Sequence, residues 1–481
     1  MKNYICVLLI VLFVAGCSKT GDAPNPGTNP PSNPPPISNP PGPDDIQITS
    51  LDISYGYTGD AIRITGKNFG TDKTALTIKI NGIATPVLMP NSPMVVSECS
   101  VKIPAHCGTG AVTVSRNGKT ATGPVFYYIP STTLTTLYGM PNVPNTGFVN
   151  GAGTNMRMQT PVDFVFDKSN NIYVADHGTN GNLVRKINGS TGVISTFSGG
   201  PLNGNTANFT TYWTIGLPAG SGGNSDVNGG QARFHLPYGI GISEGSGGVF
   251  KLFVGESSFI RVINEATATG VFAGNKKDSA STGSHENGGR FDARITVTGP
   301  PVIVPTPGDY GSPTIYFLDG TRVAKQDVAG NISTFADIAT LLSKGNLTRL
   351  ADGSFYMGSM PLYKISQGGT VSTYFKDSDS LLNKASGKNE AYQDIVNFYC
   401  KSMDMDKDGN LWIVSGSGYH ISMVKIYPDK SFVRMMVWTG GIDKDGVNGL
   451  ATLNGPGRMH IRDNGDIYII DGTAIRKMTF E

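Results

Sequence analysis

The chain has 481 residues and a balanced charge, with 38 lysines and arginines against 36 aspartates and glutamates. Only 15% of the residues are charged, whereas glycine and proline together make up about 19%, which argues against a coiled coil or a large helical bundle. Hydrophobic residues, at 38%, suffice for a sizeable core and exclude global disorder, and a net charge of +2 gives no support for a nucleic-acid partner. The composition favours an all-β protein outside the cytoplasm.

The N-terminus has the pattern of an export signal. Lys2 precedes the apolar run 5–14, which is too short to span a bilayer but typical of the core of a signal peptide. The run ends in VAGC (14–17), which resembles the lipoprotein signal of bacteria, in which the cysteine carries the lipid. We therefore expect a signal peptide and lipobox over 1–17 and a lipid anchor at Cys17 that attaches the protein to a membrane. An ordinary secreted protein is the alternative.

Residues 18–44 contain ten of the thirty prolines and are predicted to form a semi-rigid linker. Three further cysteines follow it. Cys99 and Cys107 lie eight residues apart in a chain expected in an oxidising compartment, so they are a candidate disulfide, and two free thiols are the alternative. Cys400 is expected to be a buried free thiol.

Residues 45–129 alternate apolar and polar side chains with a period of two, which predicts short strands. The dipeptides Asn81-Gly82 and Asn117-Gly118 are typical of two-residue hairpin turns, and the whole pattern predicts an immunoglobulin-like sandwich. Four segments resemble the IPT/TIG family: ITGKNFG (64–70), IKINGIAT (78–85), GTGAVTVSRNG (108–118) and VFYY (125–128). The resemblance implies an Ig-like domain that acts as a spacer or a binding module.

Beyond residue 130 one motif recurs six times, at intervals of 40 to 80 residues. It consists of an apolar residue, an aromatic residue, two mostly apolar residues and a polar end. Its copies are IYVAD (172–176), LFVGE (252–256), IYFLD (315–319), FYMGS (355–359), LWIVS (411–415) and IYIID (467–471). Repeats of this length with several strands each predict a β-propeller.

A second element, the last strand of each repeat, is missing from the sixth copy because the chain ends at Glu481. The segment LTTLYG (134–139), ahead of the first repeat, matches ISTFSG (194–199). We therefore expect this N-terminal strand to complete the last blade, giving six four-stranded blades over 130–481. Residues 161–199 and 456–478 resemble NHL-repeat propellers.

The long insertions fall between the last strand of one blade and the first strand of the next, so they share one rim, which we call the d–a rim. The insertion 200–236 is rich in Gly, Asn and Thr and includes three aromatic residues that could stack on a sugar. Packing of these aromatics against the blade is the alternative. The candidate ligand-binding residues are Phe209, Tyr212, Trp213, Arg233 and Tyr238.

Polar residues on the predicted innermost strands form a second candidate site, at the axis of the propeller. They are Asp163, Asn346, Asp404, Arg458 and His460. The resemblance to NHL-like hydrolases and lyases implies that such residues could hold a divalent metal, and a satisfied polar network that fills the pore is the alternative. We expect no other cofactor, and we favour binding over catalysis.

An IPT/TIG domain and an NHL-like propeller behind a lipobox resemble the glycan-capturing surface lipoproteins of Bacteroidetes. The resemblance implies an outer-membrane lipoprotein that captures a polysaccharide or another extracellular ligand, a protein included, on the d–a rim. A metal-dependent lactonase or lyase and a protein–protein scaffold are the alternatives. We expect the cell surface, with the periplasmic face as the alternative because no strongly acidic stretch follows Cys17.

Overall fold

A computed structural model describes the chain from residue 42 onward with gaps. The described residues are 42, 44–88, 97–141, 147–178, 182–199, 232, 234, 236–274, 285–341, 345–358, 361–375, 400–417, 420–428, 430, 432–439, 444–447, 451–453 and 455–481. All strands belong to one compact unit, Ile46–Glu481. No helix within the described residues is long and apolar enough to cross a membrane.

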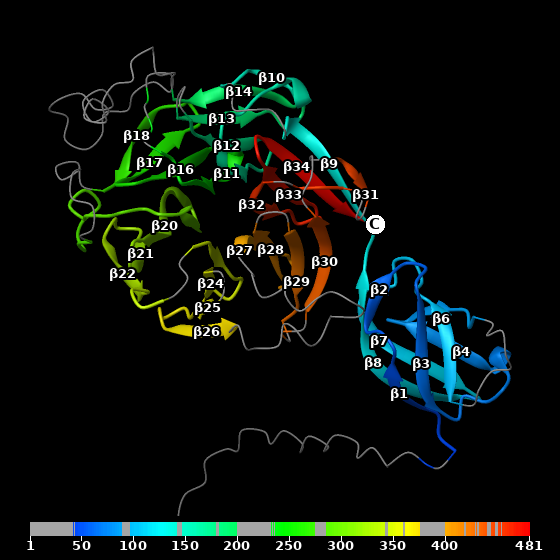
Figure 1. Ribbon diagram of the computed structural model, residues 1–481. Coiled ribbons are helices and arrows are strands. Elements are labelled where there is room, and N and C mark those ends of the chain that lie inside the picture. Colours follow the sequence, from blue (N-terminus) through cyan, green and yellow to red (C-terminus); the bar gives the residue numbers. More distant parts are fainter. Residues whose placement is uncertain are drawn as a thin grey trace, which may run out of the picture. The chain divides into compact units, whose positions relative to one another are not determined.

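The first part of this unit is a sandwich of two sheets, as expected for an Ig-like domain (Figure 1). One sheet has the order β1-β3-β6 and the other β2-β8-β7-β4-β5. Asn81, Gly82, Asn117 and Gly118 all have positive φ, so the two predicted hairpin turns are confirmed. The strands are β1 (Gln47–Leu51), β2 (Tyr55–Tyr57), β3 (Ala61–Lys67), β4 (Leu76–Ile80), β5 (Ile83–Thr85), β6 (Glu98–Lys102), β7 (Gly110–Arg116) and β8 (Lys119–Ile129), with a short 3₁₀ turn η1 (Lys73–Ala75) before β4.

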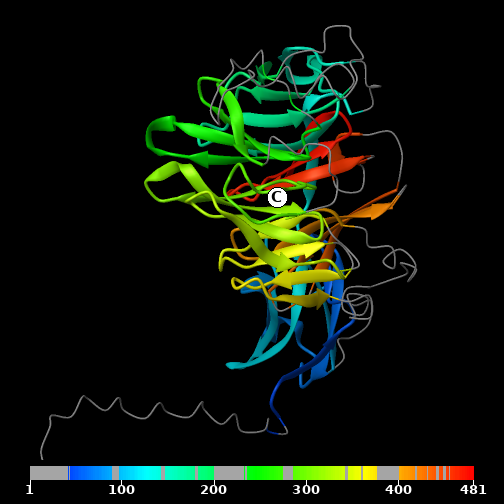
Figure 2. The same cartoon turned by 90° about the vertical axis from the view of Figure 1, so that its left-hand side faces the viewer.

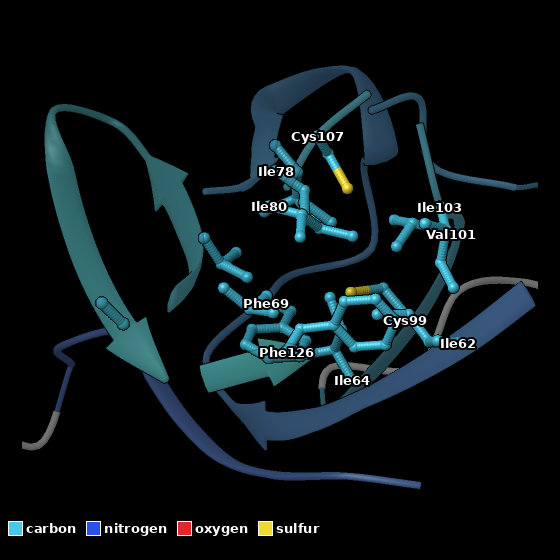
Figure 3. Packing of buried hydrophobic residues seen from close by; sticks show 14 of the residues in the cluster. Ile62, Ile64, Phe69, Ile78, Ile80, Cys99, Val101, Ile103, Cys107 and Phe126 are labelled. Atoms are coloured by element: carbon cyan, nitrogen blue, oxygen red, sulfur yellow. The ribbon is translucent and has the colours of Figure 1, made fainter. Parts of the chain in front are cut away.

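The core of the sandwich contains both cysteines that were expected to pair. Cys99 on β6 and Cys107 before β7 are free and buried. Figure 3 shows the two side chains within the hydrophobic cluster that also contains Ile78, Ile80 and Phe126. The predicted disulfide is therefore wrong: each thiol packs as a small apolar side chain. Burial raises the pKa of Cys99 to about 12 and that of Cys107 to about 11, so both stay protonated at neutral pH.

The remaining strands form six sheets around a common centre (Figure 1). We number them blades 1 to 6 in chain order. Blade 1 has β11 (Pro161–Phe166), β12 (Ile172–Asp176), β13 (Leu183–Ile187) and β14 (Val193–Ser198); blade 2 has β15 (Gly239–Glu244), β16 (Phe250–Glu256), β17 (Phe259–Asn264) and β18 (Thr269–Ala273); blade 3 has β19 (Val302–Thr306), β20 (Asp309–Asp319), β21 (Arg322–Gln326) and β22 (Ile332–Asp337).

The second half of the ring is built in the same way. Blade 4 has β23 (Leu347–Arg349), β24 (Phe355–Gly358), β25 (Leu362–Ile365) and β26 (Val371–Phe375); blade 5 has β27 (Cys400–Met405), β28 (Leu411–Ser417), β29 (His420–Ile426) and β30 (Phe432–Thr439); blade 6 has β32 (Pro456–Ile461), β33 (Ile467–Asp471), β34 (Ala474–Phe480) and β9 (Thr132–Gly139). Short edge strands β10 (Gly151–Ala152) and β31 (Gly446–Val447) extend blades 1 and 6, and 3₁₀ turns η2 (Gly153–Asn155) and η5 (Ser246–Gly248) lie in blades 1 and 2.

Each pair of neighbouring blades is held together by its own hydrophobic cluster. Between blades 1 and 2, for example, Tyr173 and Ala175 pack with Ile240 and Leu252. Figure 2 shows the sheets of blades 2 to 4, green to yellow, stacked face against face. A further cluster joins blade 6 to blade 1, so the sheets close into a ring. This is the arrangement of a β-propeller, and it is compatible with six blades.

The ring is closed by β9, as the sequence predicted. β9 pairs antiparallel with β34, with Thr132 opposite Phe480 at one end and Gly139 opposite Ala474 at the other. Figure 1 shows the cyan strand β9 beside the red strand β34. Leu134 on β9 is fully buried between blades 5 and 6. The first and last strands of the propeller thus share one sheet, which leaves no long free edge there.

Asp445 stabilises the pairing of β9 with β34 through three hydrogen bonds. Its Oδ1 accepts hydrogen bonds from the backbone N–H of Thr136 at 2.8 Å, the Thr136 hydroxyl at 2.8 Å and the Arg476 guanidinium at 2.9 Å. Burial acts to raise the pKa of Asp445, but these hydrogen bonds and the charge of Arg476 outweigh it and hold the pKa below its usual value of 3.8. The hydrogen bonds of the Asp445 carboxylate therefore stabilise the fold at pH values above 3.8 and are lost as acid protonates the carboxylate.

We expect Asp445→Asn to lower the thermal midpoint at neutral pH, because the amide keeps the shape of the side chain but loses the charge. The difference from the wild type should shrink only as the pH falls below 3.8 and through the lowered pKa of Asp445, where the wild-type carboxylate is itself neutralised. Thermal melts at several pH values measure this, with the exposed turn variant Asp408→Asn as the control. A difference that stays constant or grows in acid would contradict the role of the carboxylate.

Four blades also contain a buried ion pair between the acid that ends the second strand and an arginine of the third. The pairs are Asp176–Arg185, Glu256–Arg261, Asp319–Arg322 and Asp471–Arg476, with N–O distances of 3.7, 3.6, 2.8 and 2.8 Å. Three of the acids also accept backbone N–H groups ahead of the inner strand: Asp176 from Gln159 and Thr160, Asp319 from Thr296, and Asp471 from Gly455. Arg185 and Arg322 donate to Asn150 and Asn287 of the recurring Asn-Gly elements, so the pairs fix where the d–a loops enter the blades.

Candidate functional site

The strand register places two layers of side-chain positions at the propeller axis. In five blades one residue of the inner strand pairs with the third residue of the repeated motif on the second strand. These residues are Phe164, Ile240, Leu347, Met403 and Met459. The residues directly before and after them therefore occupy equivalent positions in each blade. Layer one is Asp163, Gly239, Pro300, Asn346, Ser402 and Arg458, and layer two is Val165, Gly241, Val302, Thr348, Asp404 and His460. Polar residues come from blades 1, 4, 5 and 6, whereas blades 2 and 3 supply only Gly, Pro and Val.

In layer one, Arg458 connects three blades. Its Nε lies 3.4 Å from Oδ1 of Asp163 on blade 1, and its Nη1 donates to Oδ1 of Asn346 on blade 4 at 2.7 Å. The Asn346 amide in turn donates to the carbonyls of Cys400 and Lys401, both at 3.2 Å. Since blade 6 is separated from blade 4 by blade 5, the Arg458 side chain lies across the channel and obstructs it.

His460 in layer two sits between two carboxylates. Its Nε2 lies 3.2 Å from Oδ1 of Asp163, and its Nδ1 lies 3.7 Å from Oδ2 of Asp404. Its ring also contacts Phe164 edge-on, with centroids 4.8 Å apart. Three contacts therefore fix the orientation of the imidazole.

The same polar side chains tie neighbouring blades together through their backbones. Asp163 accepts from the N–H of Ile240 at 3.0 Å, and Asp404 accepts from the N–H of Ile461 at 2.9 Å. Ser402 accepts from the N–H of Met459 at 2.9 Å, and Thr348 donates to the carbonyl of Met403 at 3.1 Å. Much of the axial network is therefore structural, in line with the expected alternative of a satisfied polar pore.

A cavity of about 220 Å³ remains at the axis. One side of it is apolar and comes from blades 2 and 3; the other carries Asp163, Asp404, Arg458 and His460, with Arg349 at its border. Asp163 is only 1% exposed and the Arg458 side chain 11%, whereas Asp404 and His460 are 25% and 29% exposed. The cavity therefore deepens from layer two toward a floor at layer one, and we call it the axial well. Its apolar wall consists of Ile240, Gly241, Ile242, Pro300, Pro301, Val302 and Ile303.

The described residues offer no group of three His, Cys, Asp or Glu side chains that could hold a metal ion. Both nitrogens of His460 already face carboxylates, and Asp163 is committed to Arg458 and to the N–H of Ile240. Cys400 is no substitute ligand, because burial raises the pKa of its thiol to about 12. The expected metal-binding residues are thus brought together, but in a geometry that favours a hydrogen-bonded network.

The residues predicted on the d–a rim are mostly outside the described part of the chain. Phe209, Tyr212, Trp213 and Arg233 fall there, so their role stays a prediction. Tyr238 is described and is 40% exposed, just before β15.

Sequence reasoning missed the apolar wall of the axial well and the buried ion pairs. Gly241 and Pro300 carry no reactive group, and only the shared register with Asp404 and Arg458 could have pointed to them. The ion pairs could have been found from the acid at the end of each second strand, such as Asp471, followed by an arginine such as Arg476.

Comparisons with known proteins agree with this architecture. Residues 47–129 match the IPT/TIG domain family, so this part of the chain is an IPT/TIG domain. No curated protein matches the sequence.

Solved structures resemble the chain loosely. One is a protein of unknown function from Bacteroides thetaiotaomicron, with 16% identity, a TM-score of 0.49 and coverage of 91% of this chain and 99% of that chain. An auxiliary nutrient binding protein from the same organism has 12% identity, a TM-score of 0.45 and coverage of 91% and 98%. Virginiamycin B lyase from Staphylococcus aureus has 13% identity, a TM-score of 0.39 and coverage of 73% and 100%.

Proposed function

We propose that this protein is a ligand-binding lipoprotein of the outer membrane that captures an extracellular glycan with its propeller. The observation that carries the proposal is the axial well, which is floored by buried charges and offers a polar and an apolar side to a ligand. Concave sites of this mixed character are where proteins bind small molecules.

Binding is favoured over metal-dependent catalysis by the way the polar groups are used. The carboxylate of Asp163 and the guanidinium of Arg458 neutralise each other, and His460 is held between two acids. Neither Asp163 nor Arg458 is therefore left free to activate a water molecule or to coordinate a metal. Such a network suits recognition, in which fixed donors and acceptors meet the ligand.

An array of plant, microbial and host polysaccharides and oligosaccharides tests the proposal. We expect purified protein to bind one glycan class, and no binding across the array would contradict it. Tyr212→Ala/Trp213→Ala and Asp404→Asn then separate the two candidate places. Loss of binding only in the first variant would assign capture to the d–a rim, and loss only in the second to the axial well.

The membrane anchor has its own test. We expect Cys17→Ala to move the protein from the membrane fraction to the soluble fraction and to abolish labelling with palmitate, because the acylated cysteine is the attachment point. The matched control is Cys400→Ala, which removes a thiol buried in the propeller and should leave the protein in the membrane fraction. A Cys17→Ala protein that still sediments with membranes and incorporates palmitate would contradict the anchor. Protease treatment of intact cells then distinguishes the cell surface from the periplasmic face.

A further inference from the structure

We propose that the axial well binds one neutral sugar ring, so that the protein recognises the end of a glycan chain and not its interior. The inference rests on the proposed function and names the part of the ligand that enters the propeller. Three properties of the well lead to it: its size, its charge balance and the division between its two sides.

The size of the well limits the ligand to a single ring. Its volume of about 220 Å³ lies below the roughly 300–1,000 Å³ of pockets that hold drug-sized ligands. Arg458 closes the bottom by spanning from Asp163 to Asn346, so a chain cannot thread through the propeller. A glycan can therefore reach the floor only with a terminal residue.

The charges around the well favour a neutral ligand. Two arginines, Arg349 and Arg458, and two aspartates, Asp163 and Asp404, line it, so the formal charges of these four side chains cancel. A buried ion entering such a site would lose its hydration without gaining an opposite charge in excess. A neutral molecule rich in hydrogen-bonding groups avoids this cost.

The accessible polar groups suit hydroxyls. The carboxylate of Asp404 only accepts hydrogen bonds, whereas the imidazole of His460 beside it can donate or accept, with nitrogen and oxygen 3.7 Å apart. A hydroxyl group both donates and accepts, so adjacent hydroxyls on one ring edge can bond to both residues at once. Asp163 and Arg458 below them are already engaged with each other and hold the arrangement in place.

The opposite side of the well suits the C–H face of a sugar ring. On the side of blades 2 and 3 the well is lined by the aliphatic side chains of Ile242, Pro301, Val302 and Ile303. Gly241 allows Ile303 to pack directly against β15, because a side chain at position 241 would collide with Ile303. A ring with hydroxyls on one edge and C–H groups on one face thus meets both sides at once.

The test uses the full mature chain and a panel of common hexoses, pentoses and N-acetylhexosamines together with linear oligosaccharides that end in them. We expect one monosaccharide to compete with the oligosaccharide that carries it at the terminus. The affinity for oligosaccharides of increasing length should be nearly constant, and enzymatic removal of the terminal residue should abolish binding. Isothermal titration gives these affinities.

Variants locate the interaction. Asp404→Asn should weaken binding about tenfold or more, as expected for the loss of a hydrogen bond to a charged group. The matched control Asp408→Asn, an exposed aspartate in the following turn, should bind like the wild type. Val165→Phe, which fills the well from layer two, should also abolish binding. Circular dichroism and thermal melts verify that each variant is folded.

The outcomes distinguish this inference from the proposed function. End recognition would be overturned if the affinity for oligosaccharides grows with chain length, no monosaccharide competes for binding and the Asp404→Asn variant still binds. The proposed function would stand in that case. Failure of every sugar on the panel to bind would overturn the proposed function itself.

Discussion

Deleting residues 131–139 is expected to destabilise the propeller severely. The deletion removes β9, with its seven-residue pairing to β34, and takes the fully buried Leu134 out of the contact between blades 5 and 6. Of the four strands of blade 6, only β32, β33 and β34 remain, and β34 becomes an open edge. We expect the free energy of unfolding to fall by about 4–5 kcal/mol or more, the range of severe core disruptions, with aggregation on heating.

Denaturant unfolding followed by circular dichroism measures the effect. Deletion of 1–44, which lies ahead of the strands, is the control and should leave the transition of the folded domains unchanged. Leu134→Ala is a milder test of the same contact, with an expected loss of about 2–5 kcal/mol. A 131–139 deletion that unfolds at the wild-type denaturant concentration would show that β9 does not close the ring.

Arg476→Met is expected to have the second largest effect. The Arg476 side chain is fully buried and bonds to Asp471 at 2.8 Å, to Asp445 at 2.9 Å and to the carbonyl of Lys444 at 2.7 Å. Methionine cannot satisfy the buried carboxylate of Asp471, and removing one partner of a buried ion pair costs about 3–5 kcal/mol. Chemical unfolding of the purified variant measures the loss.

The double variant Arg476→Met/Asp471→Leu separates the ion pair from general packing. If the pair acts as a unit, the double variant should be less destabilised than the sum of the two single variants, since no charge remains buried alone. Full additivity of the single effects would show that Arg476 acts through its other contacts. Lys477→Met, which replaces a partly exposed neighbour on β34, is the control for methionine in this strand.

Repeats explain how much of the fold the sequence could predict. The six copies of the motif around Tyr173 and its counterparts all lie on second strands, and the orphan segment 134–139 could only belong to the incomplete last blade. Equivalent positions in the repeats also brought Asp404 and His460 to the axis, because register within a blade follows from the motif. These conclusions depend on spacing alone and need no side-chain geometry.

Contacts between repeats were beyond that reasoning. Nothing in the spacing shows that Arg458 extends over blade 5 to Asn346, because that depends on side-chain direction and on the width of the ring. The distance of eight residues between Cys99 and Cys107 likewise does not reveal that the thiols pack separately in the core. The apolar wall of the axial well was missed because residues such as Gly241 and Pro300 matter there for their shape.

The most direct test of ligand capture in the axial well is a crystal structure of the protein with the tightest-binding oligosaccharide of the panel. The account predicts electron density for one terminal ring in the well, with hydroxyls bonded to Asp404 and His460 and its C–H face against Ile303. A chain bound along the d–a rim, with no sugar in the well, would contradict it.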